Sequence, residues 1–161
     1  MTTRITHILV RTLRGYAAGL LFLSLAVHLA AFAGFQPPGG NLLFGGLHIG
    51  VFPLVLALIL LGKRLPGMMD VKTDNWRLPV FPGCPAWISH MTRGICVYAL
   101  LHVAIVFLAA LVSTGTATLS MSHSLADGDP SLAAWREFSA IWMPIYSTAF
   151  AQLPGARTPK G

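Results

Sequence analysis

Three histidines that interrupt long uncharged stretches are the residues whose chemistry first needs an explanation. They are His28, His48 and His102, and each is flanked by apolar residues on both sides. An imidazole can donate a hydrogen bond, accept one or ligate a metal. An unpaired imidazole is costly in apolar surroundings, so we expect each ring to face a partner.

Three kinds of chemistry fit these histidines. In the first, each donates a hydrogen bond to a neighbouring helix: His28 to a carbonyl of the stretch that contains His48, and His102 to Tyr146, Ser147 or Thr148. In the second, two histidines on facing helices ligate haem b. In the third, one histidine hydrogen-bonds a quinone carbonyl. We favour the first, and the sequence leaves the other two open.

Motifs of other catalytic or metal sites are missing from the sequence. It holds no CxxCH, P-loop, GxGxxG or HExxH pattern, and no pair of carboxylates within an apolar stretch. Cys84 and Cys96 are twelve residues apart, a spacing that matches no recognised metal site. We therefore predict no catalytic residue and no metal ligand.

Composition indicates the elements that must position the histidines. Of 161 residues, 55% are hydrophobic and 10% are charged, whereas soluble domains have about 25% charged residues. Runs of about 20 apolar residues are long enough to cross about 30 Å of hydrocarbon as helices. A fourth helix is expected to start at Pro130, after Asp129 as N-cap. We take it as a fourth span, and a re-entrant or surface helix is the alternative. We predict an all-α integral membrane four-helix bundle, a single membrane domain over 1–161, with spans at about 15–36, 42–62, 94–113 and 130–153.

Charge predicts the orientation of these spans. Ten of the 11 basic residues lie before the first span, between the second and third, or after the fourth, and Arg136 alone lies on the other side. By the positive-inside rule, both termini and the loop 63–93 are cytoplasmic and the loop 114–129 is periplasmic. The net charge of +6 is therefore a topology signal, and we expect a bacterial inner-membrane location and no nucleic-acid partner.

Small residues and a proline shape the first two spans. Gly15 and Gly19 in the first span, and Gly46 and Gly50 in the second, are spaced for close helix packing. Pro53 removes one helix hydrogen bond and predicts a bend near His48.

The turn "QPPGG" joins the first two spans, so we expect them to be antiparallel neighbours. His28 and His48 then lie within about 3 Å of the same depth. We expect His48 to face protein and to pair with His28 at any cofactor site, with His102 as the alternative ligand.

The N-terminal segment carries a basic face. Arg4, Arg11 and Arg14 share one side of a helix over residues 1–14. Such a helix either lies on the anionic lipid headgroups of the inner leaflet or extends the first span.

Three stretches carry a resemblance to known sequences: "LHIGVF" (47–52), "GCPAWISHMTRG" (83–94) and "FSAIWMPIYSTAFA" (138–151). They resemble a group of small, uncharacterised bacterial four-span inner-membrane proteins. The resemblance implies four spans and supplies no activity. That group often has a histidine where this chain has Ile141, so a ligand site using that position is absent or altered here.

These observations favour a non-catalytic accessory or structural subunit of a larger bacterial membrane protein complex. Its partners would be the lipid bilayer and other membrane subunits. The alternative is a small membrane protein that binds haem b or a quinone for electron transfer, through His28, His48 or His102.

Overall fold

The chain is entirely helical wherever its structure is described. The computed structural model describes residues 2–62, 84–114 and 130–153, and no strand occurs in these ranges. The helices are α1 (Thr2–Phe32), α2 (Gly40–Ile49), α3 (Val51–Gly62), α4 (Ala86–Thr114) and α5 (Pro130–Gln152). Three segments are long and apolar enough to cross a membrane, namely Thr6–Phe32, Gly40–Leu61 and Ala86–Ala109. The predicted all-α class is confirmed.

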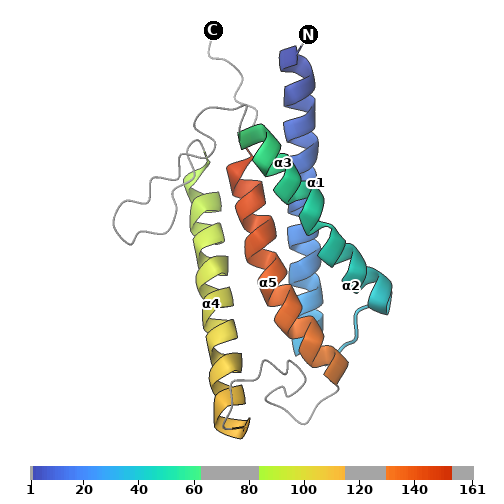
Figure 1. Cartoon of the computed structure of the whole chain (residues 1–161), viewed down its shortest axis with the longest axis vertical. Coiled ribbons are helices and arrows are strands. Elements are labelled where there is room, and N and C mark those ends of the chain that lie inside the picture. Colours follow the sequence, from blue (N-terminus) through green and yellow to red (C-terminus); the bar gives the residue numbers. More distant parts are fainter. Residues whose placement is uncertain (1, 63–83, 115–129, 154–161) are drawn as a thin grey trace.

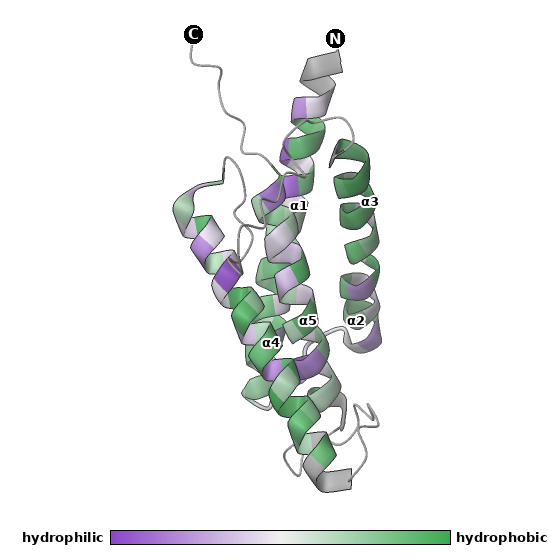
Figure 2. Cartoon of the chain, turned by 60° about the vertical axis from the view of Figure 1, so that its left-hand side comes forward, coloured by the Kyte–Doolittle hydropathy of each residue, from purple (hydrophilic) through white to green (hydrophobic). Residues whose placement is uncertain are grey.

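Helix α5 is the centre of the arrangement. It packs against α1, against α4 and against the bent pair α2–α3. The N-terminal end of α1 and the C-terminal end of α5 lie at the same end of the molecule, and α5 runs antiparallel to α1 and α4 (Figure 1). Hydrophilic positions occur on α1, α2 and α4 as well as on α5 (Figure 2). Helix α5 carries buried Ser139 and Ser147, which its neighbours cover.

Helices α1 and α5 meet along a seam in which small residues alternate with large ones. The buried positions alternate in steps of three and four residues, the spacing of antiparallel and parallel coiled-coil seams. The small members allow close backbone approach, which is the main source of attraction between helices in lipid. The series is Ala17, Leu21, Ser24, His28 and Ala31 on α1, and Trp135, Ser139, Trp142, Tyr146, Ala149 and Leu153 around α5.

Helix α1 is continuous from the basic N-terminal segment to the connection with α2. The basic segment therefore extends the first span, which was one of the two expected arrangements. The helix ends at Phe32, short of the predicted boundary at about 36, because Gly34 adopts φ 81°. The amide of Phe35 donates to the Ala30 carbonyl (2.9 Å) and that of Gly34 to the Ala31 carbonyl (3.3 Å), as in a Schellman motif.

The second apolar stretch is broken into two helices. Helix α2 ends at Ile49, Gly50 forms a turn, and α3 starts at Val51. Pro53 is then the third residue of α3, where its missing N–H costs little. The predicted bend is present, and it is centred three residues before the proline.

Helix α4 starts at Ala86, eight residues before the predicted span boundary at Gly94. The amides of Ile88 and Ser89 donate to the Pro85 carbonyl at 3.1 and 3.2 Å, and this turn begins the helix. The predicted loop 63–93 is therefore helical over its last eight residues. Residues 63–83 and 115–129, including Asp129, lie outside the described residues, and α5 begins at Pro130 as predicted.

Candidate functional site

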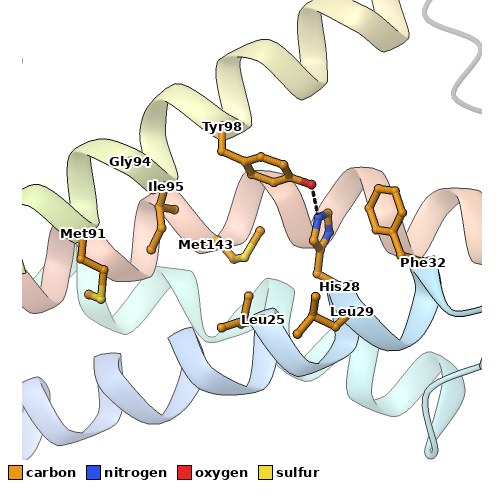
Figure 3. A pocket seen from close by; sticks show the side chains of 9 residues that line it. All are labelled: Leu25, His28, Leu29, Phe32, Met91, Gly94, Ile95, Tyr98 and Met143. Atoms are coloured by element: carbon orange, nitrogen blue, oxygen red, sulfur yellow. Dashed lines mark hydrogen bonds between the residues drawn. The ribbon is translucent and has the colours of Figure 1, made fainter.

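His28 links three helices of the described bundle through hydrogen bonds of its ring. Its ring is buried, with Nδ1 2.8 Å from Ser139 Oγ of α5 and Nε2 2.5 Å from Tyr98 Oη of α4. Figure 3 shows the Tyr98 hydroxyl pointing at the imidazole from across the gap between α1 and α4. Both ring nitrogens are therefore engaged within the chain.

The neighbours of Ser139 determine the direction of these hydrogen bonds. Ser139 Oγ lies 2.5 Å from the Trp135 carbonyl, which can only accept, so the serine proton lies between these two oxygens. Nδ1 of His28 must then carry the proton and donate to Ser139. Nε2 is left as an acceptor, and the Tyr98 hydroxyl donates to it. The chain of bonds runs Tyr98 to His28 to Ser139 and ends on a backbone carbonyl, which cannot pass a proton onward.

His102 lies beside this cluster without completing it. Its ring centroid is 5.7 Å from that of His28 and 5.9 Å from that of Tyr98. Nε2 of His102 is buried and has no hydrogen-bond partner among the residues that the structure describes. The predicted donation to Tyr146, Ser147 or Thr148 does not occur among the described residues, because the His102 ring lies beside His28 and Tyr98. The Tyr146 hydroxyl donates to the Leu47 carbonyl of α2.

His48 lies on the other side of α5, in an aromatic cluster. Its ring is exposed, stacks with Phe44 at 6.0 Å, and makes edge contacts with Phe138 at 5.6 Å and Trp142 at 5.8 Å. Neither ring nitrogen has a hydrogen bond within the described ranges. The ring faces α5, as predicted, but it stays largely exposed. The prediction that His48 pairs with His28 is wrong, because α1 turns His28 toward α4 and α5.

Of the four glycines predicted to pack, Gly50 alone lies against another helix of the described chain. A Cβ there would lie 2.9 Å from Leu20 Cδ1 and 3.1 Å from Tyr16 Oη, both on α1. At Gly15, Gly19 and Gly46 a Cβ would meet nothing within 4 Å. The small buried residues of α1 on the side of α5 are Ala17, Ser24 and Ala31. They were not among the predicted packing residues, although their spacing of seven residues was a usable signal.

The basic residues of the predicted headgroup face have different surroundings. Arg11 is exposed, whereas the Arg14 guanidinium lies 4.8 Å from the centre of the Phe150 ring of α5. Arg4 lies in α1, and its side chain is outside what the structure describes. Arg14 therefore contributes to helix packing as well as to charge at this end of the bundle.

An apolar groove opens between α1 and α4, with α5 at its floor (Figure 3). It has a volume of about 530 Å³, and its only polar side-chain groups are the His28 imidazole and the Tyr98 hydroxyl. Gly94 forms part of its α4 wall, where a Cβ would meet nothing within 4 Å. The lining residues are Leu25, His28, Leu29, Phe32, Met91, Gly94, Ile95, Tyr98 and Met143.

Several buried polar atoms on α4 lack a partner. Within the described ranges, Ser89 Oγ, Arg93 Nε and His102 Nε2 make no hydrogen bond, and Glu137 Oε2 of α5 makes none either. Such atoms are costly to leave unpaired. Three of these four lie on α4, so this helix is the one whose polar groups the chain satisfies least.

Comparisons with known proteins identify no relative of this chain. No protein-family model, no curated protein and no solved structure matches the chain. Within the part of the chain that the structure describes, no group of three histidine, cysteine or acidic side chains is placed to hold a metal ion. The function must therefore be argued from the site alone.

Proposed function

We propose that this protein is a non-catalytic subunit of a larger bacterial membrane protein complex. The observation that supports it most directly is the bonding of His28. Its two ring nitrogens are used to tie α1 to α4 and α5, and the hydrogen-bond chain ends on the Trp135 carbonyl. The buried imidazole of His28 thus serves to hold helices together.

Two further features favour a partner subunit. Gly15 and Gly19 lie one helical turn apart on an exposed face of α1, and a Cβ at either meets no neighbour. Polar atoms of Ser89 and Arg93 on α4 are buried without a partner in the described chain. A second protein packed on these helices would use the small residues for close approach.

The haem alternative fits the geometry less well. A haem ligand must offer a free imidazole nitrogen to iron. Nε2 of His28 accepts from Tyr98, and His48 lies on the far side of α5. Neither the pair His28–His48 nor the pair His28–His102 presents two free nitrogens to a shared space.

A co-purification experiment with matched glycine variants tests the proposed subunit role. The tagged full chain is extracted in a mild detergent, and the proteins bound to it are identified by mass spectrometry. We expect Gly19→Leu to lose a discrete set of membrane proteins while its melting temperature stays unchanged, because the leucine projects from an open face. Gly94→Leu, also at an open position but on the groove, is expected to keep them. Purification of the wild type without any stoichiometric protein would contradict the proposal.

We propose further that α5 is a fourth span and that both termini are cytoplasmic. Its 23 residues extend about 35 Å as a helix, enough to cross the hydrocarbon. Its Ser139, Tyr146 and Ser147 side chains are buried against protein, so this span does not need the apolarity of its neighbours.

Thiol labelling in cells tests this orientation. A cysteine introduced at Ser120 should react with an impermeant reagent from the periplasm, and Cys84 should not. Burial raises the pKa of the Cys84 thiol, an effect that Arg14 partly offsets. The positive control is labelling of Cys84 in permeabilised cells, and it needs an alkaline buffer because the thiolate is the reactive form. Reaction of Cys84 in intact cells would reverse the orientation.

A further inference from the structure

We propose that the groove between α1 and α4 binds a hydroquinone with an apolar tail, and that it prefers this reduced form to the quinone. The proposal does not depend on the subunit role. It concerns what enters the groove from the lipid, and it follows from the shape of the groove and from the direction of one hydrogen bond.

The shape suits a ligand that arrives from the side. The groove lies between two helices that are exposed along much of their length, and its walls are leucine, isoleucine, phenylalanine and methionine side chains. Its volume of about 530 Å³ is within the range of small-molecule sites. A single ring with part of an aliphatic tail fits such a space.

Gly94 keeps the α4 wall of the groove open. Glycine is less favourable than alanine in a helix interior. Packing within the described chain does not require a glycine here, because a Cβ at this position would meet nothing within 4 Å. The space that Gly94 leaves lies between Met91, Ile95 and Tyr98, and it belongs to the groove. Gly94 therefore enlarges the groove, and packing within the described chain does not require a glycine at this position.

The polar end of the groove selects a donor. Tyr98 donates its only proton to Nε2 of His28, so its oxygen can offer nothing but lone pairs to a ligand. His28 has no free position, because Nδ1 donates to Ser139. A phenolic O–H of a hydroquinone can donate to Tyr98 Oη, whereas a quinone carbonyl, an acceptor, finds no free donor among the side chains that line the groove.

The surroundings of this end suit an aromatic head. The rings of Phe32, His28 and Tyr98 form edge contacts or a hydrogen bond with one another at one end of the groove. Met91 and Met143 add sulfur atoms, which make favourable contacts with aromatic rings and adapt to their shape. A second groove, between α3 and α5, has only Thr148 as a polar lining residue and lacks these aromatic groups.

Binding is measured on the full chain in lipid nanodiscs under anaerobic conditions, with empty nanodiscs to correct for partition into lipid. The probes are a benzohydroquinone with a ten-carbon tail, the matching benzoquinone, and a ten-carbon alcohol. We expect saturable binding of about one hydroquinone per chain. The quinone should bind about threefold to tenfold more weakly, the effect of one hydrogen bond, and the alcohol should bind more weakly still because it has no ring.

Matched glycine variants locate the ligand. Gly94→Leu fills the groove and should abolish saturable hydroquinone binding, whereas Gly19→Leu, at an equally open position outside the groove, should leave it unchanged. Melting temperatures of both variants check that the fold is intact. Equal affinity for quinone and hydroquinone, an alcohol that binds as tightly, or full binding by Gly94→Leu would each overturn the proposal. Since Gly19→Leu is the variant that tests the subunit role, failure of one proposal leaves the other standing.

Discussion

The two faces of α5 give a neighbouring histidine different surroundings. On the face toward α1 and α4, His28 is buried and both ring nitrogens are hydrogen-bonded to side chains of other helices. On the face toward α2, His48 is exposed and only aromatic rings touch it. The two residues look alike in the sequence, since each is a lone histidine in an apolar stretch. What separates them is the chemistry of the adjacent α5 residues, Ser139 on one face and Phe138 on the other.

This difference shows how hydrogen bonds offset the energetic cost of burying polar side chains of α5 in apolar surroundings. The hydroxyls of Ser139 and Tyr146 reach backbone carbonyls, and Ser139 also accepts from His28. A hydrogen bond between helices in a membrane contributes about 0.6–1.7 kcal/mol. Among the described residues the His48 ring itself makes ring contacts alone, and those tolerate substitution better.

The largest effect is expected at His28. His28→Ala removes two hydrogen bonds to other helices and leaves a cavity in the seam of α1 and α5. We expect a loss of about 2–4 kcal/mol of stability, measured by unfolding of the purified chain in detergent. A loss below about 0.5 kcal/mol, within the ordinary range of surface substitutions, would remove the structural role assigned to this residue.

The next effect separates two glycines on the α2 side. Gly50→Leu places a side chain against Leu20 and Tyr16 and should cost about 1–3 kcal/mol. Gly46→Leu meets nothing within the described chain and should leave the stability of the isolated chain nearly unchanged. Equal stability of the two variants would show that α1 does not approach Gly50 as closely as described.

The smallest effect is expected at His48. His48→Leu keeps an apolar contact with Phe44, Phe138 and Trp142 and removes no hydrogen bond made in the described chain. The change in unfolding free energy should stay within about 0.5 kcal/mol. Destabilisation as large as that of His28→Ala would mean that the two faces do not differ, and the comparison would fail.

The sequence predicted the helices better than it predicted their rotation. Length and apolarity located four helical segments, and Pro53 indicated the bend near Gly50. A run that is apolar on all sides does not say which face meets a neighbour. Gly15 and Gly19 were expected to pack without a named partner, and the seam between α1 and α5 follows Ala17 and Ser24.

Pairing of side chains across helices was the part that sequence could not supply. The choice of Tyr98 and Ser139 as partners of His28 depends on α5 lying between the other helices. Tyr98 lies four residues before His102 in an apolar run, and a tyrosine hydroxyl in such a place needs a partner. That signal marks it as a candidate without naming His28.

The most direct test of the central claim is the tautomer of His28. Nitrogen NMR of the full chain with ¹⁵N-labelled histidine, assigned by comparison with His28→Ala, distinguishes a protonated ring nitrogen from a bare one. The hydrogen-bond chain from Tyr98 through His28 to Ser139 predicts a proton on Nδ1 and none on Nε2 across the neutral pH range. A proton on Nε2 with a bare Nδ1 would reverse both hydrogen bonds, and it would contradict the account of His28 and the preference for hydroquinone together.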